Sequence, residues 1–360
     1  MLSLLLVQVL LTTYTTAASL RNPASFFSFG PTANLLKNVT NGPPDFPLSV
    51  SQLFGLVSTP EGQDSWYYLR SAVIRSGGAL HMRNEILNAM SSQEIKQFAL
   101  QTRSLGLNLS LEDGGALCGA GSGVTRGNSV IAMLKPVIAN GGTLAFLLLE
   151  SIFSRTSVTC PTQTLNTTAT EIAEFAATVG TGVSPQTVRF FLYDALPHYS
   201  VRDVNGGGVV WPANLPSYGL DLGIVLTLLQ GAMLEKGVKL EGYWMDCPYE
   251  YSRDYPNATS PYPLGSGWQR VASAVSLVHS LNLKVAKTFN TQSGGSTSNQ
   301  EFYQFTLQDF KNTSQALAKA GVALDGAMVE TWYNFPRLAS PETTSYTSAY
   351  TALEVVSAFG

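Results

Sequence analysis

The feature that most limits the fold of this sequence is a repeated succession of helix-like run, glycine and apolar run. It occurs as "TRSLGLNL", "LEKGVKLEG" and "LAKAGVALDG". A glycine directly after a helix is typical of the left-handed residue at which helices end. A continuous apolar run is typical of a parallel strand that is buried on both faces. The sequence therefore predicts an α/β protein with a parallel sheet.

Eight apolar runs are candidate strands, and helix-like runs separate most of them. One helix is predicted from Ser91, where Glu94 completes a capping box, to Gly106. Eight strands with intervening helices predict a (β/α)8 TIM barrel, and an open doubly wound sheet is the alternative. No composition shift divides the chain, so we expect a single domain over residues 19–360. The candidate strands cover residues 25–30, 79–82, 107–112, 143–150, 187–194, 240–246, 283–290 and 325–331.

Residues 1–18 have the pattern of a secretory signal peptide. An apolar stretch from Leu2 to Leu11 precedes small polar residues and ends at Ala17-Ala18, although no Lys or Arg follows Met1. The stretch is too short to span a bilayer, and a buried N-terminal helix is the alternative. We therefore expect a secreted protein.

Asparagine sequons agree with secretion. Asn108 lies in a predicted strand, so we do not expect it to carry a glycan. The sequons at which glycosylation is predicted are Asn38, Asn166, Asn257 and Asn312.

The chain has three cysteines, so at least one is unpaired. Cys118 and Cys160 both fall in loops after successive predicted strands, and we predict a disulfide between them. Cys247 is then the free thiol. Neither the cysteines nor the three dispersed histidines have the spacing of a metal site, and we expect no metal and no cofactor.

Charge excludes several classes of partner. Only 12% of residues are charged, the net charge is −3, and there is no basic run, so we expect no nucleic-acid partner. No later stretch is long and apolar enough for a transmembrane helix, so we expect no membrane partner. We also expect the protein to be a monomer. The glycines of "GAGSGVTRG" lack G-x-G-x-x-G spacing, which argues against a dinucleotide.

Acidic residues stand at the ends of five predicted strands. In a (β/α)8 barrel these ends meet at the mouth that carries the active site. Glycoside hydrolysis needs one carboxyl group that holds a proton and a second that is ionised. We predict Glu150 as general acid/base and Asp246 as nucleophile or second carboxylate. Asp194 is predicted as a third catalytic residue, which orients sugar hydroxyls or adjusts the pKa values of this pair. The remaining strand-end acids, which we expect to orient sugar hydroxyls, are Glu112, Asp113 and Glu330.

Aromatic residues gather at the same strand ends. Sugar rings stack their C–H faces on aromatic side chains, so this combination favours a carbohydrate substrate, while packing of the barrel rim is the alternative. His198 is expected to form hydrogen bonds at the rim. The candidate substrate-binding aromatics are Trp244, Tyr249, Tyr251, Trp332 and Tyr333.

Four of these segments, "LLLES", "YDALPHYS", "YWMDCPYEY" and "ETWYNFPRLASPET", resemble a largely uncharacterised group of secreted glycoside-hydrolase-like (β/α)8 proteins. The resemblance implies the barrel fold, secretion and a carbohydrate substrate. It places Glu150, Asp194, Asp246 and Trp332 with Pro341-Glu342 at the motif positions of the group.

The sequence departs from this group at two positions. Leu149 stands where the group has aspartate, and Glu330 stands where it has a neutral amide. A non-catalytic carbohydrate-binding barrel is therefore an alternative. A polysaccharide lyase is another, for which His198 and Arg202 are the candidate groups.

Overall fold

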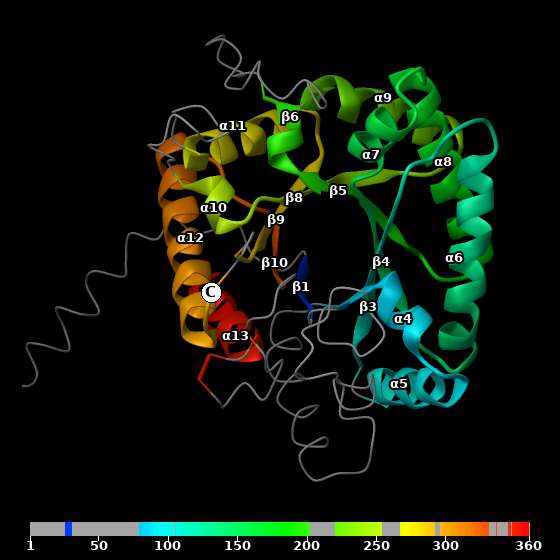
Figure 1. The fold of residues 1–360 in the computed structure, drawn as a ribbon, viewed down its shortest axis with the longest axis horizontal. Coiled ribbons are helices and arrows are strands. Elements are labelled where there is room, and N and C mark those ends of the chain that lie inside the picture. The colour runs from blue at the N-terminus through cyan, green and yellow to red at the C-terminus, as the bar shows by residue number, and fades with distance from the viewer. Residues whose placement is uncertain are drawn as a thin grey trace, which may run out of the picture.

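The computed structural model describes residues 26–30, 79–104, 106–201, 220–253, 267–291, 296–330, 336, 345–346 and 348–359. Within these residues eight parallel strands close into a barrel, and helices surround it as an outer ring (Figure 1). The fold is therefore the predicted (β/α)8 barrel, and the open doubly wound sheet is excluded. The signal peptide predicted for residues 1–18 lies outside the described residues, as do Asn38 and Asn257.

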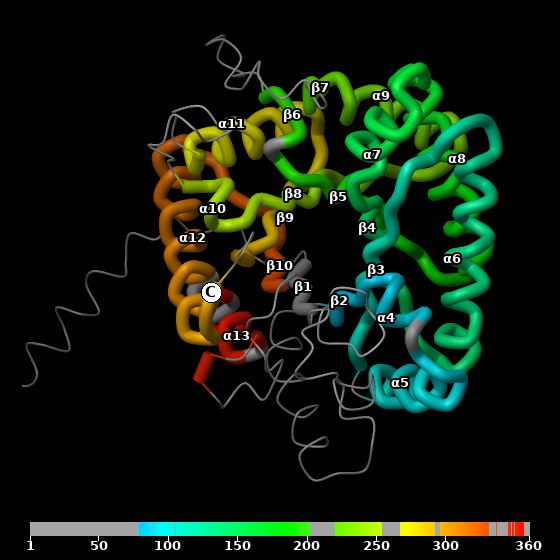
Figure 2. Tube along the Cα trace, viewed as in Figure 1, coloured from blue at the N-terminus to red at the C-terminus, as the bar shows by residue number. Residues whose placement is uncertain are grey.

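The chain passes round the barrel once, so consecutive strands are neighbours, and β10 pairs with β1 (Figure 2). Every strand predicted from the sequence overlaps one of the observed strands. In order round the barrel these are β1 (Phe26–Gly30), β2 (Ala79–Arg83), β3 (Asn108–Gly114), β4 (Leu144–Glu150), β5 (Arg189–Ala195), β8 (Leu240–Asp246), β9 (Lys284–Phe289) and β10 (Gly326–Glu330).

The helices between the strands cover the barrel from outside. A short 3-10 helix, Leu196–His198, and the two-stranded sheet of β6 (Tyr199–Ser200) and β7 (Leu220–Asp221) follow β5. No helix within the described ranges is long and apolar enough to cross a membrane. The helices are α4 (Asn84–Ala89), α5 (Ser92–Ser104), α6 (Ser122–Ala139), α7 (Ile152–Thr159), α8 (Leu165–Gly182), α9 (Leu222–Glu235), α10 (Tyr249–Ser252), α11 (Gly267–Ser280), α12 (Asn299–Ala320) and α13 (Ser348–Phe359).

The predicted joints between helices and strands are present. Gly106, Gly237 and Gly321 have φ angles of +65°, +72° and +70°, the left-handed conformation that glycine adopts without strain. The capping box of α5 is formed as well: the Ser91 backbone N–H donates to Glu94 Oε2 at 2.8 Å, and the Glu94 N–H donates to Ser91 Oγ at 3.3 Å.

Alternate strand residues fill two separate cores. One set faces the helices and forms the larger core. The other set faces the barrel axis, where Trp244 meets the rings of Phe146 and Phe191 edge-to-face at 6.3 and 5.6 Å. This interior layer closes the barrel below its C-terminal mouth, so the fold has no open channel at that level.

A buried ion pair lies behind β9, on its helix-facing side. Lys287 Nζ forms an ion pair with Asp309 of α12, and both side chains are fully buried. The same ammonium donates to the Cys247 carbonyl at 2.6 Å, and Trp268 Nε1 of α11 donates to Asp309 Oδ1 at 2.9 Å. The pair therefore connects the ends of β8 and β9 to the two helices that cover them.

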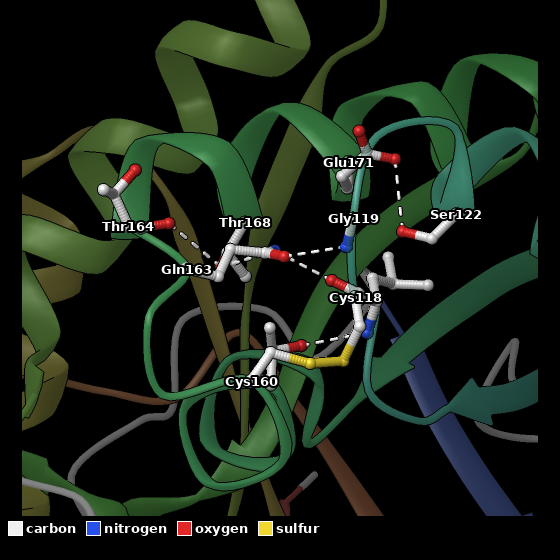
Figure 3. The surroundings of a disulfide bond; sticks show 10 residues. Cys118, Gly119, Ser122, Cys160, Gln163, Thr164, Thr168 and Glu171 are labelled. Carbon is white, nitrogen blue, oxygen red and sulfur yellow. Dashed lines mark hydrogen bonds between the residues drawn. A yellow bond between two sulfur atoms is a disulfide. The ribbon is translucent and has the colours of Figure 1, made fainter.

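The predicted disulfide between Cys118 and Cys160 is present and joins the loop after β3 to the end of α7 (Figure 3). Gln163 holds the same loop, because its amide accepts from Gly119 N–H at 2.9 Å and donates to the Leu117 carbonyl at 2.8 Å. Cys247 is buried and free, as predicted.

Replacing both Cys118 and Cys160 by alanine is expected to lower the free energy of unfolding by about 2–4 kcal/mol, because the bond closes a long loop in the unfolded chain. The loop spans a sequence separation of 42 residues. Urea unfolding with and without reductant measures the effect. Reductant should destabilise the natural protein and leave the double variant unchanged, and equal behaviour of the two proteins would contradict the prediction.

The "GAGSGVTRG" segment is the start of α6 and does not form an anion site. The N–H groups of Gly121 and Gly123 donate to the Glu171 carboxylate of α8 at 3.1 and 2.9 Å. Ser122 Oγ donates to the same carboxylate at 3.2 Å (Figure 3). A carboxylate from the neighbouring helix thus takes the place that a phosphate takes at other helix N-termini.

Candidate active site

The direction of each strand-end side chain follows from its register. Trp244 lies in the interior layer, so Asp246, two residues later on β8, faces the barrel axis as well. The same alternation on β4 and β10, and a contact between His81 and Glu112, define a group of interior-facing residues that we call the mouth cluster. Its members are His81 (β2), Glu112 (β3), Glu150 (β4), Asp246 (β8) and Glu330 (β10).

His81 lies between two acids of the mouth cluster. Its Nε2 is 3.2 Å from Glu112 Oε2 and 3.5 Å from Glu330 Oε1, and its Nδ1 is 3.2 Å from Ser110 Oγ. All four side chains are buried. Burial opposes a charge on the imidazole, but the charge of Glu330 and the contacts to both acids outweigh it and raise the pKa of His81 to about 9.

Glu150 is one of the acids whose surroundings favour a bound proton. Glu150 is only 8% exposed to solvent. Burial and the charge of Glu112 raise the pKa of Glu150 to about 8. Arg155 Nη2 donates to Glu150 Oε1 at 2.6 Å and opposes the rise, but the Arg155 side chain is 48% exposed, so solvent screens its charge.

Gly114 makes room for this carboxyl group at the end of β3. A Cβ atom at position 114 would lie 2.0 Å from the Glu150 carbonyl oxygen and 2.6 Å from Glu150 Oε2. Both separations are far below contact distance. Only glycine therefore allows β3 and the Glu150 carboxyl group to approach this closely.

Gly114→Ala is expected to displace Glu150, and to lower the free energy of unfolding by about 1–3 kcal/mol. The matched control is Gly231→Ala within α9, where an added Cβ meets nothing within 4 Å. It should be neutral or stabilising, because alanine favours a helix interior. Thermal unfolding of the two variants compares them. If the two variants unfold at the same temperature, β3 can move away from Glu150 without loss of stability, and the prediction is wrong.

Asp246 resembles Glu150 in its pKa. Burial raises the pKa of Asp246 to about 8, with further contributions from the charges of Glu330 and Glu112. Its Oδ1 is buried and accepts no hydrogen bond from the described residues. Tyr193, from the strand next to β8, donates its hydroxyl to Glu330 Oε2 at 3.4 Å. The mouth cluster therefore combines two acids whose pKa values are raised to about 8 with two acids that contact His81.

Two predicted site acids face the helices instead of the barrel axis. Asp113 accepts two hydrogen bonds from Arg126 of α6, at 2.8 and 2.6 Å, and one from Asn84 of α4 at 2.7 Å. It braces the helices that follow β2 and β3. The expected substrate-binding role of Asp113 is therefore corrected: its neighbour Glu112 faces the mouth, and Asp113 does not.

Asp194 is the centre of a buried hydrogen-bond network on the helix-facing side of β5. Its carboxylate accepts from Tyr199 OH at 2.7 Å, from the Ala195 N–H at 2.8 Å and from Ser154 Oγ at 3.1 Å, and His198 Nδ1 lies 2.7 Å away. Both oxygens of this carboxylate therefore accept hydrogen bonds within the protein. Asp194 therefore faces the helices and holds the loop after β5, which corrects its predicted position at the mouth, and His198 makes a hydrogen-bond contact of the kind expected of it.

Leu149 also faces the helices, where it is fully buried in the larger core. The departure from the resembled group at this position therefore changes a helix-facing residue and leaves the mouth cluster unchanged.

The predicted set of substrate-binding aromatic residues at the strand ends is only partly supported. Trp244 is fully buried within the interior layer, so it does not offer a face to a sugar, which corrects that prediction. Tyr249 stacks on Phe305 with centroids 4.8 Å apart, and Tyr251 packs against the larger core. Both remain partly exposed at the barrel rim. Trp332, Tyr333 and Arg202 lie outside the described residues.

His81 is the site residue that the sequence analysis missed. It stands in the strand "ALHM", where one face carries leucine and methionine and the other carries the histidine. A titratable residue on one face of an otherwise apolar strand was the available signal. Its neighbour Arg83, also interior-facing, places Nε 3.7 Å from Glu112 Oε1.

No family model matches the chain, and no curated protein matches it. The structure is similar to a solved structure of a fungal β-1,4-galactanase, with 10% identity, a TM-score of 0.48, and coverage of 80% of this chain and 90% of that chain. It is also similar to the endo-1,4-β-xylanase XylE of Penicillium canescens, with 10% identity, a TM-score of 0.45, and coverage of 93% and 95%.

A third similar structure is the D-psicose 3-epimerase of Clostridium cellulolyticum H10 with D-tagatose, with 11% identity, a TM-score of 0.41, and coverage of 81% of this chain and 91% of that chain. Similarity at this level says nothing about the chemistry of the present chain. Membership of the group that the sequence resembles stays a prediction.

Proposed function

We propose that the protein is a glycoside hydrolase in which Glu150 is the general acid and Asp246 is the second carboxylate. The mouth cluster carries this proposal. Glu150 and Asp246 both have pKa values raised to about 8, while Glu112 and Glu330 lie against the His81 cation. Hydrolysis of a glycosidic bond needs one carboxyl group that holds a proton and one that is ionised, and near pH 8 one member of this pair can hold its proton while the other is ionised.

In this mechanism the protonated Glu150 gives its proton to the glycosidic oxygen as the bond to the anomeric carbon breaks. Glu150 is then an anion, and Arg155, whose Nη2 lies 2.6 Å from Glu150 Oε1, stabilises it. Water adds its oxygen to the anomeric carbon, directly or after attack by Asp246, and Asp246 or Glu150 accepts the water proton. Glu112 and Glu330 orient sugar hydroxyls.

We also infer that the protein acts outside the cell, because residues 1–18 have the pattern of a signal peptide. Asn166, on the first turn of α8, is exposed and accessible to a glycan. The disulfide between Cys118 and Cys160 fits an oxidising compartment. Glycosylated protein recovered from the medium of expressing cells, with an N-terminus near Ser19, would support this inference. Retention of the N-terminal segment in the cell would oppose it.

The pH dependence of hydrolysis follows from the two raised pKa values. Glu150 must hold its proton, and its pKa of about 8 removes activity as the pH rises above that value. Asp246 must be ionised, and its pKa of about 8 removes activity as the pH falls below it. The productive state is then most populated near pH 8, and kcat/KM should follow a narrow bell centred there. A maximum in clearly acidic solution would contradict these assignments.

The direct test is the release of reducing sugars from a panel of polysaccharides and glycoprotein glycans. We expect release by the natural protein and its loss in Glu150→Gln and Asp246→Asn. The matched control is Glu241→Gln, since Glu241 pairs with Arg189 and Lys284 away from the mouth cluster. If both cluster variants keep full activity, the proposed roles are wrong. Binding of glycans without any release would favour a carbohydrate-binding barrel, and an unsaturated product would mark a lyase.

A further inference from the structure

The donor atoms of His81, Glu112 and Glu330 have the spacing of metal ligands. One atom from each lies within 4.8 Å of the others. His81 Nε2 is 3.2 Å from Glu112 Oε2 and 3.5 Å from Glu330 Oε1. Nitrogen and oxygen ligands that surround Zn²⁺ tetrahedrally at about 2.1 Å are about 3.4 Å from one another. Two edges of such a coordination shell are therefore already in place.

The histidine ring has the orientation of a metal-binding imidazole. Nδ1 lies 3.2 Å from Ser110 Oγ, and Ser110 and His81 are both buried. A polar partner on one ring nitrogen fixes the ring and directs the other nitrogen, here Nε2, at the ligand position. When Nδ1 carries the hydrogen, the Nε2 lone pair faces two carboxylate oxygens, and a metal ion can take the place of the proton that Nε2 otherwise holds between them.

A second, independent observation comes from Glu330. Its side chain is fully buried, and among the described residues the 3.5 Å ion-pair contact with His81 Nε2 is the partner of Glu330 Oε1, which accepts no regular hydrogen bond. This is the oxygen that points at His81 Nε2. A buried carboxylate oxygen needs a positive charge beside it, which either a protonated His81 or a metal ion in place of that proton supplies. Asp246 Oδ1 is buried without a hydrogen bond in the same way.

We propose that His81 Nε2, Glu112 and Glu330 bind one divalent transition-metal ion of the Zn²⁺ or Mn²⁺ class inside the barrel mouth. One imidazole nitrogen beside carboxylate oxygens favours these ions over Mg²⁺ and Ca²⁺, which take oxygen ligands alone. Two carboxylates balance the charge of the ion. The three ligands come from β2, β3 and β10, so the ion would connect strands on both sides of β1.

The first experiment is calorimetric titration of chelator-treated, untagged protein with ZnCl₂ and MnCl₂, with MgCl₂ and CaCl₂ as comparison ions. We expect one equivalent of Zn²⁺ or Mn²⁺ to bind, and binding more than about 100-fold weaker in Glu330→Gln, which keeps the side-chain size but loses the charge. Glu241→Gln is the matched control and should bind like the natural protein. Circular dichroism establishes that each variant is folded.

Glu112→Gln replaces the first variant if Glu330→Gln does not fold. X-ray absorption at the metal edge of the natural protein needs no variant, and it should show imidazole nitrogen with oxygen donors. Failure of the folded natural protein to take up either ion overturns the proposal. So does unchanged binding in the glutamine variants, or a sulfur ligand, which would place the ion at Cys247. Binding is read without turnover, so this proposal and the proposed hydrolysis fail separately.

Discussion

Replacing Glu150 by glutamine is expected to slow the hydrolysis of natural glycans by about 10²–10⁴-fold, the usual contribution of a general acid. The amide keeps the shape of the side chain but has no acidic proton to give to the leaving oxygen. Substrates that need no protonation should be affected far less. An aryl glycoside with a strongly acidic phenol as leaving group should therefore keep most of its rate in the Glu150→Gln variant.

The measurement compares kcat/KM for a series of aryl glycosides of increasing leaving-group acidity. In the natural protein the rate should depend weakly on the leaving group, and in the variant steeply. The variant should also lose the alkaline decline of the pH profile, since that decline reports Glu150. Equal losses for all leaving groups would assign Glu150 to another task, such as holding Arg155.

Removal of one partner from the buried ion pair behind β9 is the change with the largest expected effect on stability. Asp309→Ala should lower the free energy of unfolding by about 3–5 kcal/mol, because it leaves a buried ammonium without its counter-charge. Lys287 and Asp309 are both fully buried, so water cannot take over this role without opening the core. Urea unfolding followed by circular dichroism measures the loss.

Two comparisons make this test specific. The double variant Lys287→Met with Asp309→Leu removes both charges and should recover much of the lost stability, since apolar pairs of similar size replace buried ion pairs well. Glu174→Ala breaks the ion pair with Lys236 at the surface and should change stability little. If Asp309→Ala lowers the free energy of unfolding as little as Glu174→Ala does, another group compensates the charge of Lys287 and the prediction is wrong.

Much of the barrel could be predicted from the sequence, because its signals are local. Continuous apolar runs mark strands that are covered on both faces, and a glycine at each joint marks the helix end before them. Gly106, Gly237 and Gly321 have the left-handed conformation that this reasoning requires. The disulfide could be predicted for a similar reason, since loops after neighbouring strands lie side by side at the same edge.

The direction of side chains could not be predicted equally well. Consecutive strand residues face opposite sides, so a shift of one residue in an estimated strand exchanges mouth and core. Glu112 and Asp113 are adjacent, and only Glu112 faces the mouth. Asp194 and Asp246 both end strands, yet Asp194 faces the helices and Asp246 the barrel axis. Composition gives no warning of the difference.

The pKa shifts of the mouth cluster also could not be predicted from the sequence. The pKa of Glu150 is raised by its burial and by Glu112, and that of Asp246 by its burial and by Glu330 and Glu112. These neighbours are far away in the chain and come together only when the barrel closes. His81 was overlooked for the same reason, because its partners lie on β3 and β10.

The pairing of β1 with β10 bears on how the chain reaches this state during its synthesis. Phe26–Gly30 aligns with Gly326–Glu330, so the first strand made has to wait for the last one. At about 5–20 residues per second, this wait is on the order of 15–60 s. Through that time the growing sheet has two open edges, and Glu330 has not yet joined the other acids. The nascent chain therefore has an incomplete mouth cluster until β10 is made. Chaperones that cover exposed sheet edges would act in this interval.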